Sequence, residues 1–284
     1  MRNTINKPDF LIIGSMKCGT TTLYSDLSKL SALHLPSRKE PSILTQHEAI
    51  KEIQHAYQEH FQGADTHQLC GEASTNYTKL PIYNGVPEKA YQLCGEHLKL
   101  IMIMRDPVDR ICSHLRHNIS GRKITLDEVD DVVLSDTAYI SISNYSMQLE
   151  PWIEKFGPNN IYCISLARYK NNREQSIREI ASFLNINATR ISLENEQIYN
   201  KGTELRYTGN ATARFLGTRL YRNIIRPLLS DSSRSFCRKL LLPKARYEDI
   251  KLSPQVEHEL RHRLSHVETD IEKLLGRAIS FHAN

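Results

Sequence analysis

The chain has 284 residues, of which 40% are hydrophobic and 24% charged, and its formal net charge is +5. This length allows one generous hydrophobic core, and the composition is typical of an ordinary globular protein. No apolar run approaches the roughly 20 residues of a membrane span, and the first residues lack the basic-then-apolar layout of a secretory signal. We therefore expect a cytoplasmic protein without a transmembrane segment.

Short apolar runs alternate with helical patterns along the chain. We expect strands at residues 9–13, 68–73, 97–105 and 160–166, and helices at residues 20–30, 106–118, 173–184, 212–229 and 254–275. A continuous apolar run such as 9–13 is typical of a strand that is buried on both faces of a parallel sheet. The alternation predicts an α/β fold in three layers, a central parallel sheet flanked by helices, in a single domain over residues 1–284.

The segment IIGSMKCGTTTL joins the first expected strand to the first expected helix. Gly14 and Gly19 have the separation found in the nucleotide loop G-x-x-x-x-G-K-[ST], but Thr20 stands at the lysine position and the lysine is Lys17 instead. Flexible glycines, a helix N-terminus and three threonines still suit an anion. The apparatus for a magnesium-bound triphosphate is missing, so we expect a P-loop type of fold whose ligand ends in a less charged group, such as a sulfuryl group on a phosphate.

This loop resembles the 5′-phosphosulfate-binding loop of sulfotransferases, which use PAPS (3′-phosphoadenosine 5′-phosphosulfate). Its form, G-x-x-K-x-G-T-T-x-L, looks more like the carbohydrate branch, including the heparan sulfate enzymes and their bacterial relatives. A second segment, LIMIMRDPVDRICSHL, resembles the family's 3′-phosphate site, in which a serine follows the arginine of R-D-P by eight residues. Arg105 and Ser113 match that spacing. Taken alone, Arg105 beside Asp106 is also the pattern of a structural ion pair at a strand end.

The resemblance implies a set of donor-binding residues and no metal. The six cysteines form no C-x-x-C pair and no metal-type Cys/His spacing, which agrees with that expectation. The expected contacts to PAPS are Lys17, Cys18, Gly19, Thr20, Thr21, Thr22, Arg105 and Ser113. The later segment NKGTELRY resembles the loop that closes over the adenosine end, with Lys201, Gly202 and Arg206 as contacts, although a basic surface loop is the alternative reading.

Two further segments resemble the acceptor side of the family's site. SRKEPSIL looks like the segment that carries the catalytic base, which makes Glu40 the candidate base and its neighbour Lys39 a candidate contact to an acidic acceptor. In CGEASTNYT, Glu72 and Tyr77 match positions that we expect to bind the acceptor. Ala73 stands where the heparan sulfate enzymes have a lysine, and this departure argues against heparan sulfate itself.

The resemblance does not cover residues 212–248, where basic residues outnumber acidic ones. The helix expected at 212–229 is basic and amphipathic. Such a helix can lie on an anionic membrane as a peripheral contact, grip an acidic glycan, or simply pack its apolar side on the core. We expect this segment to be the part of the fold that varies within the family.

The resemblance implies an enzyme that moves a sulfuryl group from PAPS to a hydroxyl of a carbohydrate or glycolipid and releases adenosine 3′,5′-bisphosphate (PAP). Glu40 would take the hydroxyl proton, and Lys17 would stabilise charge on the leaving oxygen. A P-loop kinase or nucleotide hydrolase is the first alternative. A non-catalytic module that binds an anionic glycan or a membrane is the second, and no motif favours nucleic acid.

Overall fold

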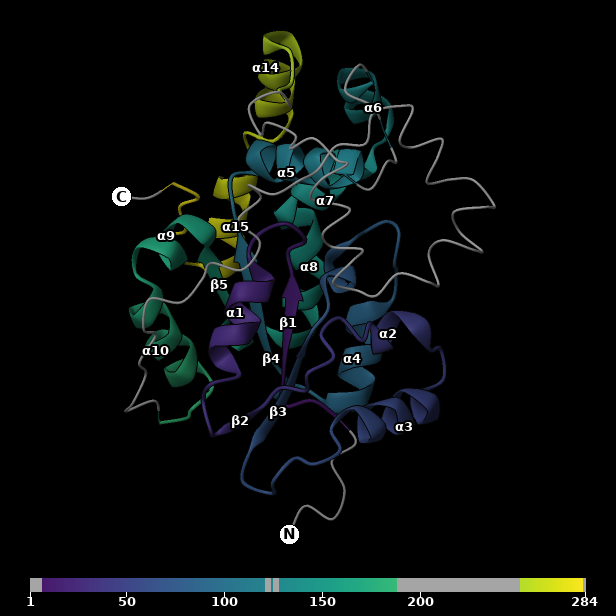
Figure 1. Cartoon of the computed structure of the whole chain (residues 1–284), viewed down its shortest axis with the longest axis vertical. Coiled ribbons are helices and arrows are strands. Elements are labelled where there is room, and N and C mark those ends of the chain that lie inside the picture. The colour runs from purple at the N-terminus through teal and green to yellow at the C-terminus, as the bar shows by residue number, and fades with distance from the viewer. Residues whose placement is uncertain (1–6, 121–123, 125–127, 188–250, 283–284) are drawn as a thin grey trace, which may run out of the picture.

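The fold was analysed in a computed structural model, which describes residues 7–120, 124, 128–187 and 251–282. Five strands form one parallel sheet in the order β2-β3-β1-β4-β5 (Figure 1). The strands are β1 (Phe10–Gly14), β2 (Leu33–His34), β3 (Leu69–Ala73), β4 (Lys99–Met104) and β5 (Ile161–Ser165). The expected strands are confirmed to within two residues, and only the two-residue β2 was not predicted.

Helices cover the sheet and its C-terminal edge. They are α1 (Thr20–Leu27), α2 (Ile43–Gln46), α3 (Ile50–His60), α4 (Val86–Cys94), α5 (Pro107–Ser120), α6 (Val129–Ser135), α7 (Ala138–Ser143), α8 (Tyr145–Phe156), α9 (Leu166–Asn171), α10 (Arg173–Phe183), α14 (Pro254–Arg263) and α15 (Val267–Leu275), with 3-10 turns at Thr75–Thr78 and Pro158–Asn160. In Figure 1, α1 passes in front of the strands and α8 behind them, while α5 and α7 lie beyond the ends to which the strands point. The expected α/β architecture is confirmed.

The middle of the sheet is buried on both faces, as continuous apolar runs predict. Every residue of β1 is buried, and only the first residue of β4 is not. Trp152 of α8 is 1% exposed and packs in the same core. The helix expected at 254–275 is two helices, because the backbone leaves the helical region at Leu264, where α14 ends. Within the described ranges, no helix is long and apolar enough to cross a membrane.

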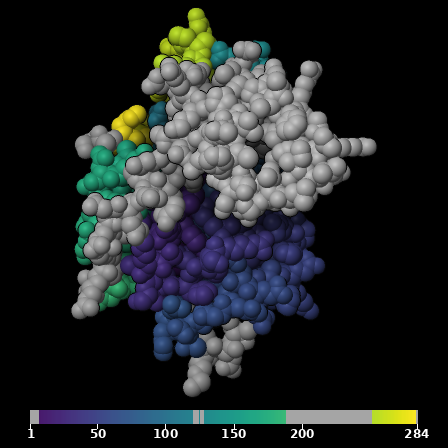
Figure 2. All heavy atoms as spheres, viewed as in Figure 1, coloured from purple at the N-terminus to yellow at the C-terminus, as the bar shows by residue number. Residues whose placement is uncertain are grey.

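A buried ion pair holds α1 against the helices that follow β5. The Asp26 carboxylate is fully buried; it accepts hydrogen bonds from the Arg173 guanidinium, at 2.6 Å for both Nε and Nη2, and from the Tyr169 hydroxyl. Figure 2 shows the purple atoms of the α1 region beside the green atoms of α9 and α10 on this face. The pair therefore fixes the helix that begins at the glycine-rich loop.

The strand order brings three loops together at one edge of the sheet. β1 lies between β3 and β4, so the segments that follow these three strands meet at the C-terminal ends, where parallel α/β sheets bind ligands. Backbone hydrogen bonds continue the pairing past the strand ends, from Ser15 N–H to the Ile103 carbonyl (2.8 Å) and from Ser74 N–H to the Ile12 carbonyl (3.1 Å). The candidate site lies at this edge.

Candidate functional site

The loop after β1 has the backbone of an anion cradle. Lys17 (φ 69°) and Gly19 (φ 96°) adopt left-handed conformations, and Gly19 is the residue before α1. A side chain at Gly19 would place its Cβ 2.7 Å from Leu166 Cδ1, and one at Gly14 would place it 2.2 Å from Thr78 Oγ1. Both glycines of the motif are therefore required by close approach, and Gly19 also by its backbone conformation.

The three threonines form the first turn of α1, a helix N-terminus that favours an anion, although the N–H of Thr22 already bonds to the Gly19 carbonyl at 3.1 Å. Thr20 and Thr22 are nearly buried, whereas Thr21 is half-buried. Cys18 was also expected to contact the donor, but its polar groups already have partners in the protein. Its thiol is buried beside the Tyr145 hydroxyl (3.4 Å) and its N–H bonds to the Ser15 carbonyl (3.2 Å), so both polar groups are used within the protein.

The candidate base, Glu40, lies on a second loop. Hydrogen bonds hold this loop to the glycine-rich loop after β1 (residues 14–22), which is the candidate donor loop. Glu40 (φ 58°) and Ser42 (φ 54°) are both left-handed, a costly conformation for residues with side chains that is typical of functional loops. Glu40 Oε1 accepts a hydrogen bond from Lys39 Nζ at 2.7 Å, and the same Nζ donates to Thr20 Oγ1 at 3.3 Å. Thr75 Oγ1 donates to Glu40 Oε2 at 3.0 Å. Lys39 thus bridges the exposed carboxylate to the first residue of α1.

The segment at the end of β3 supports this loop from inside the protein. Glu72 and Tyr77 are 0% and 2% exposed. The Glu72 carboxylate accepts hydrogen bonds from the hydroxyls of Tyr77, Tyr57 (3.2 Å) and Ser74 (2.7 Å). The expectation that Glu72 and Tyr77 bind the acceptor is therefore corrected, because both side chains are buried and bonded to each other.

Burial makes Glu72 an unusual carboxyl group. It raises the pKa of Glu72 from 4.5 to about 7, although the three hydroxyl donors oppose the shift and the nearby Glu40 adds to it. The same burial raises the pKa of Tyr77 well above its usual value. Ser74 links this cluster to the base loop, since its Oγ donates to Glu72 and accepts a hydrogen bond from Ser42 N–H at 2.9 Å.

The expected 3′-phosphate residues follow β4. Arg105 comes directly after the strand, and its Nη2 donates to Asp109 Oδ2 at 3.0 Å, while its buried Nε has no partner among the described residues. Asp106, the alternative partner, instead caps α5 by accepting from Asp109 N–H and contacts Arg261. Ser113 lies two turns along α5 and is half-buried. Arg105 therefore keeps donor capacity for a ligand.

Positive charge is concentrated around the loop. The pKa of Lys17 is lowered by burial and then by the charges of Arg105 and Arg110. The pKa of His114 is lowered to about 3, first by burial and then by Arg110, so this ring is neutral at physiological pH. Arg110 was not predicted from the sequence. The sequence shows only that a basic residue lies between the R-D-P triplet and Ser113, three residues before the serine.

Some of the buried polar atoms without a hydrogen-bond partner lie at the same place, while others, such as His34 Nε2 and His60 Nε2, lie elsewhere in the described part of the chain. Ser15 Oγ, Arg105 Nε and Arg110 Nη1 are all buried without a hydrogen-bond partner among the described residues. Native proteins rarely leave such groups unsatisfied, and a bound polar ligand is a common reason. The three atoms belong to the loop after β1, the end of β4 and the first turns of α5. An anionic ligand across these ends fits the residues present.

Several expected contacts lie outside the described residues. These are Lys201, Gly202 and Arg206, together with the basic segment 212–248. Within the described ranges, no group of three or more His, Cys, Asp or Glu side chains is placed to hold a metal ion.

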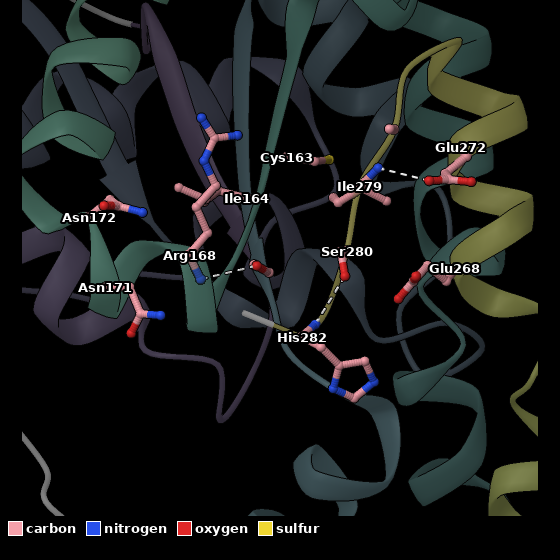
Figure 3. Close-up of a pocket in the computed structure, with 12 residues that line it drawn as sticks. Cys163, Ile164, Arg168, Asn171, Asn172, Glu268, Glu272, Ile279, Ser280 and His282 are labelled. Carbon is pink, nitrogen blue, oxygen red and sulfur yellow. Dashed lines mark hydrogen bonds between the residues drawn. The ribbon is translucent and has the colours of Figure 1, made fainter. Parts of the chain in front are cut away.

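A separate pocket of about 550 Å³ lies at the outer strand β5. Figure 3 shows Cys163 and Ile164 of β5, Arg168 of α9 and the C-terminal residues Ile279, Ser280 and His282 around it. Glu268 and Glu272 contribute carboxylates to its wall, and Arg168 is paired with Glu179. This lining does not suit a polyanion, so the pocket is not the donor site.

Comparisons with known proteins agree with the fold and the loops. Residues 7–208 match the family described as "Sulfotransferase domain". Over 119 residues the chain is 34% identical to the membrane-associated sulfotransferase kil1 of Dictyostelium discoideum, and this alignment covers 41% of the chain and 24% of the length of that relative.

Solved sulfotransferase structures share the fold. The crystal structure of a sulfotransferase from Alicyclobacillus acidocaldarius superposes with a TM-score of 0.65 at 18% identity, covering 95% of this chain and 96% of that one. Mouse sulfotransferase SULT7A1, complexed with PAP, gives a TM-score of 0.51 at 14% identity over 95% and 87% of the two chains. The family match includes the glycine-rich loop, the Glu40 loop and the Arg105–Ser113 segment. The chain therefore belongs to the sulfotransferase domain family, whose chemistry is the transfer of a sulfuryl group.

Proposed function

We propose that the protein transfers a sulfuryl group from PAPS to a hydroxyl of a carbohydrate or glycolipid acceptor, with Glu40 as the base. The observation that carries this proposal is the bridge made by Lys39, whose Nζ bonds both Glu40 Oε1 (2.7 Å) and Thr20 Oγ1 (3.3 Å). It holds an exposed carboxylate next to the first turn of α1. A base and an anion cradle side by side are what sulfuryl transfer to a hydroxyl requires.

The donor's charged groups would occupy the C-terminal edge of the sheet. The loop from Gly14 to Thr22 suits the phosphosulfate, because Lys17 and the N-terminus of α1 offer positive charge and N–H donors to an anion. Arg105 and Ser113 suit the 3′-phosphate, since a guanidinium with a free donor and a hydroxyl two helical turns away can converge on one group.

The chemical step then uses side chains and backbone N–H groups of this chain. Glu40 accepts the proton of the acceptor hydroxyl, whose oxygen forms a bond to sulfur while the bond between sulfur and the phosphate oxygen breaks. PAP leaves with the electron pair of that bond. Lys17 and the loop N–H groups stabilise the negative charge that develops on the leaving oxygen, an interaction that acts mainly in the transition state.

The acceptor class rests on the form of the loop and of the Glu40 segment. Arg38 and Lys39 beside the base suit an acceptor that carries acidic groups, but Lys39 is already paired with Glu40. A cytoplasmic location and a peripheral membrane contact stay predictions, the latter in view of the membrane-associated relative. The kinase reading is not favoured by the family match.

Calorimetric titration of the full chain tests the donor. We expect PAP to bind without magnesium, and Arg105→Ala to weaken that binding roughly 10- to 100-fold, because a charge-assisted hydrogen bond contributes about 1.5–3 kcal/mol. ATP with magnesium serves as the comparison ligand. Tight magnesium-dependent ATP binding with no affinity for PAP would mean that the donor assignment is wrong.

Transfer of labelled sulfate from PAPS to a panel of glycans, glycolipids and small phenols tests the acceptor and the base. Glu40→Gln keeps the size and one oxygen acceptor but cannot take a proton. We expect turnover to fall about 10²- to 10⁴-fold with unchanged PAP affinity. Full activity in this variant would exclude Glu40 as the base, and transfer to phenols alone would exclude the carbohydrate acceptor.

A further inference from the structure

Arg110 is a fully buried arginine on α5, one turn before Ser113. Its Nε donates to Ser143 Oγ at 2.6 Å, and its Nη2 donates to the Tyr139 carbonyl at 3.1 Å. Both partners are neutral and belong to α7. The third nitrogen, Nη1, is buried and has no hydrogen-bond partner among the described residues. The guanidinium is therefore fixed in place by two bonds with one nitrogen unused.

No carboxylate balances this charge in the described part of the chain. Arg110 forms no ion pair with a described residue, in contrast to Asp26, whose buried charge is matched by Arg173. Its remaining neighbour is His114, whose Nδ1 lies 3.5 Å from Nη2. That ring is neutral, so it accepts from the guanidinium without adding negative charge. A buried charge without a counter-charge destabilises a protein by several kcal/mol.

The charge lies close to the donor loop. Arg110 contributes to lowering the pKa of Lys17, after burial and Arg105. The geometry agrees, because Ser15 N–H of the loop bonds to the Ile103 carbonyl of β4 at 2.8 Å, and α5 begins at Pro107, just past the end of that strand. The charge of Arg110 also acts on the pKa of Cys18 and Tyr145, the pair under the loop. Three cations therefore converge on this region, and of these Arg105 has an exposed carboxylate partner, Asp109.

We propose that Arg110 is a positioning residue of the donor site, a buried cation whose counter-charge is the bound PAPS or PAP. This inference rests on the proposed function, since it takes PAPS as the donor. The unbalanced charge costs stability in the empty protein and is offset when the phosphate groups bind. Its role is to strengthen donor binding through the electrostatic field beneath the loop, where low dielectric makes a charge more effective than at the surface.

The experiment compares four variants of the full chain by calorimetric titration with PAP, with AMP and with adenosine. Arg110→Gln and Arg110→Met remove the charge, and Arg110→Lys keeps it. Arg178→Met removes an exposed charge from α10, where Arg178 pairs with Glu174, and serves as the matched control. We expect the Gln and Met variants to lose about 10- to 100-fold in PAP affinity, with Lys and the control within about threefold of wild type.

Two readouts separate an electrostatic role from a structural one. The loss should be greatest for PAP, smaller for AMP and absent for adenosine, because it scales with ligand charge. The melting temperature of the empty Gln or Met variant should equal or exceed that of wild type, whereas the rise on adding PAP should shrink. If Met fails to fold, Gln provides the same comparison.

The opposite outcomes are equally clear. Wild-type affinity for PAP in Arg110→Gln, or equal losses for PAP and adenosine, would overturn the inference while leaving the donor assignment intact. Failure of the wild-type protein to bind PAP would overturn the donor assignment itself and this inference with it.

Discussion

The buried carboxyl group of Glu72 makes the stability of the protein depend on pH. In the folded state Glu72 is fully buried on β3 and its pKa is raised to about 7, from 4.5. The folded protein therefore binds one more proton than the unfolded chain between these two pH values. The contribution of Glu72 to the free energy of unfolding therefore falls as the pH rises through this window, because the unfolded chain ionises Glu72 more easily.

The magnitude follows from the size of the shift. One pKa unit corresponds to about 1.4 kcal/mol, so the raised pKa of Glu72 removes about 3 kcal/mol of stability between pH 4.5 and pH 7. Glu72→Gln resembles the protonated carboxyl group, because its amide oxygen accepts from Tyr57 and Tyr77, and its amide nitrogen can donate to Ser74. We expect the variant to match wild type near pH 5 and to exceed it by about 3 kcal/mol at pH 8.

Urea denaturation at pH 5, 6, 7 and 8 measures this difference directly. Other titrating groups affect both proteins alike, so the informative quantity is the gap between the variant and wild type at each pH. Glu150→Gln, an exposed change on α8, is the control and should show no widening gap. A gap that stays constant from pH 5 to pH 8 would refute the reasoning, since it would mean that Glu72 is ionised throughout.

Further changes test the packing of the donor loop. Asp26→Asn should lower the free energy of unfolding by about 3–5 kcal/mol, because a neutral amide replaces the buried carboxylate that bonds Arg173 and Tyr169, and urea denaturation would show it; a loss below about 1 kcal/mol would contradict this. Gly19→Ala should weaken PAP binding roughly tenfold or more, because a methyl group is strained in this left-handed backbone and must displace Leu166 Cδ1, 2.7 Å away. Gly63→Ala, also left-handed but in open space, should cost only about 1–2 kcal/mol and leave PAP affinity unchanged; equal effects at both glycines would exclude the steric argument.

The sheet could be predicted because its strands are buried on both faces. Short continuous apolar runs such as LIMIM favour strands of this kind, and all four expected strands are present. The helices α3 and α8 were missed for different reasons. In α3 only Ile53 and Tyr57 are buried, which leaves a weak periodic signal. In α8 the sequence contains Pro151, which normally argues against a helix interior, yet the helix continues through it.

The break between α14 and α15 was not predicted, because the apolar pattern continues across it. Val256, Leu260, Leu264, Val267 and Ile271 keep a helical spacing across the break, and all are buried. A continuous amphipathic pattern predicts one helix, because periodicity reports which residues face the core and not whether the backbone turns between them. Only the packing against α5 and α8 in the folded protein places the turn.

Spacing predicted the candidate site residues, and burial separates candidates that spacing could not distinguish. Glu40 and Glu72 are both carboxylates in segments with a family resemblance, yet Glu40 is exposed and Glu72 is sealed among hydroxyl groups. No sequence pattern shows which carboxylate faces solvent. The same limit applies to Arg110, whose lack of a described carboxylate partner becomes visible only when α5 and α7 are seen together.

Ala73, at the end of β3, supports the Glu40 loop although it lacks the side chain of a lysine. Its side chain is 0% exposed, so a lysine there would have to rearrange the end of β3 to reach an acceptor. Ala73 contacts the Glu40 loop through its backbone, because its carbonyl accepts a hydrogen bond from the Glu40 N–H at 2.9 Å. Ser74 adds a second tie, from Glu72 to Ser42 N–H. The end of β3 therefore holds Glu40, the proposed base, in its left-handed conformation, and these contacts need no lysine at position 73.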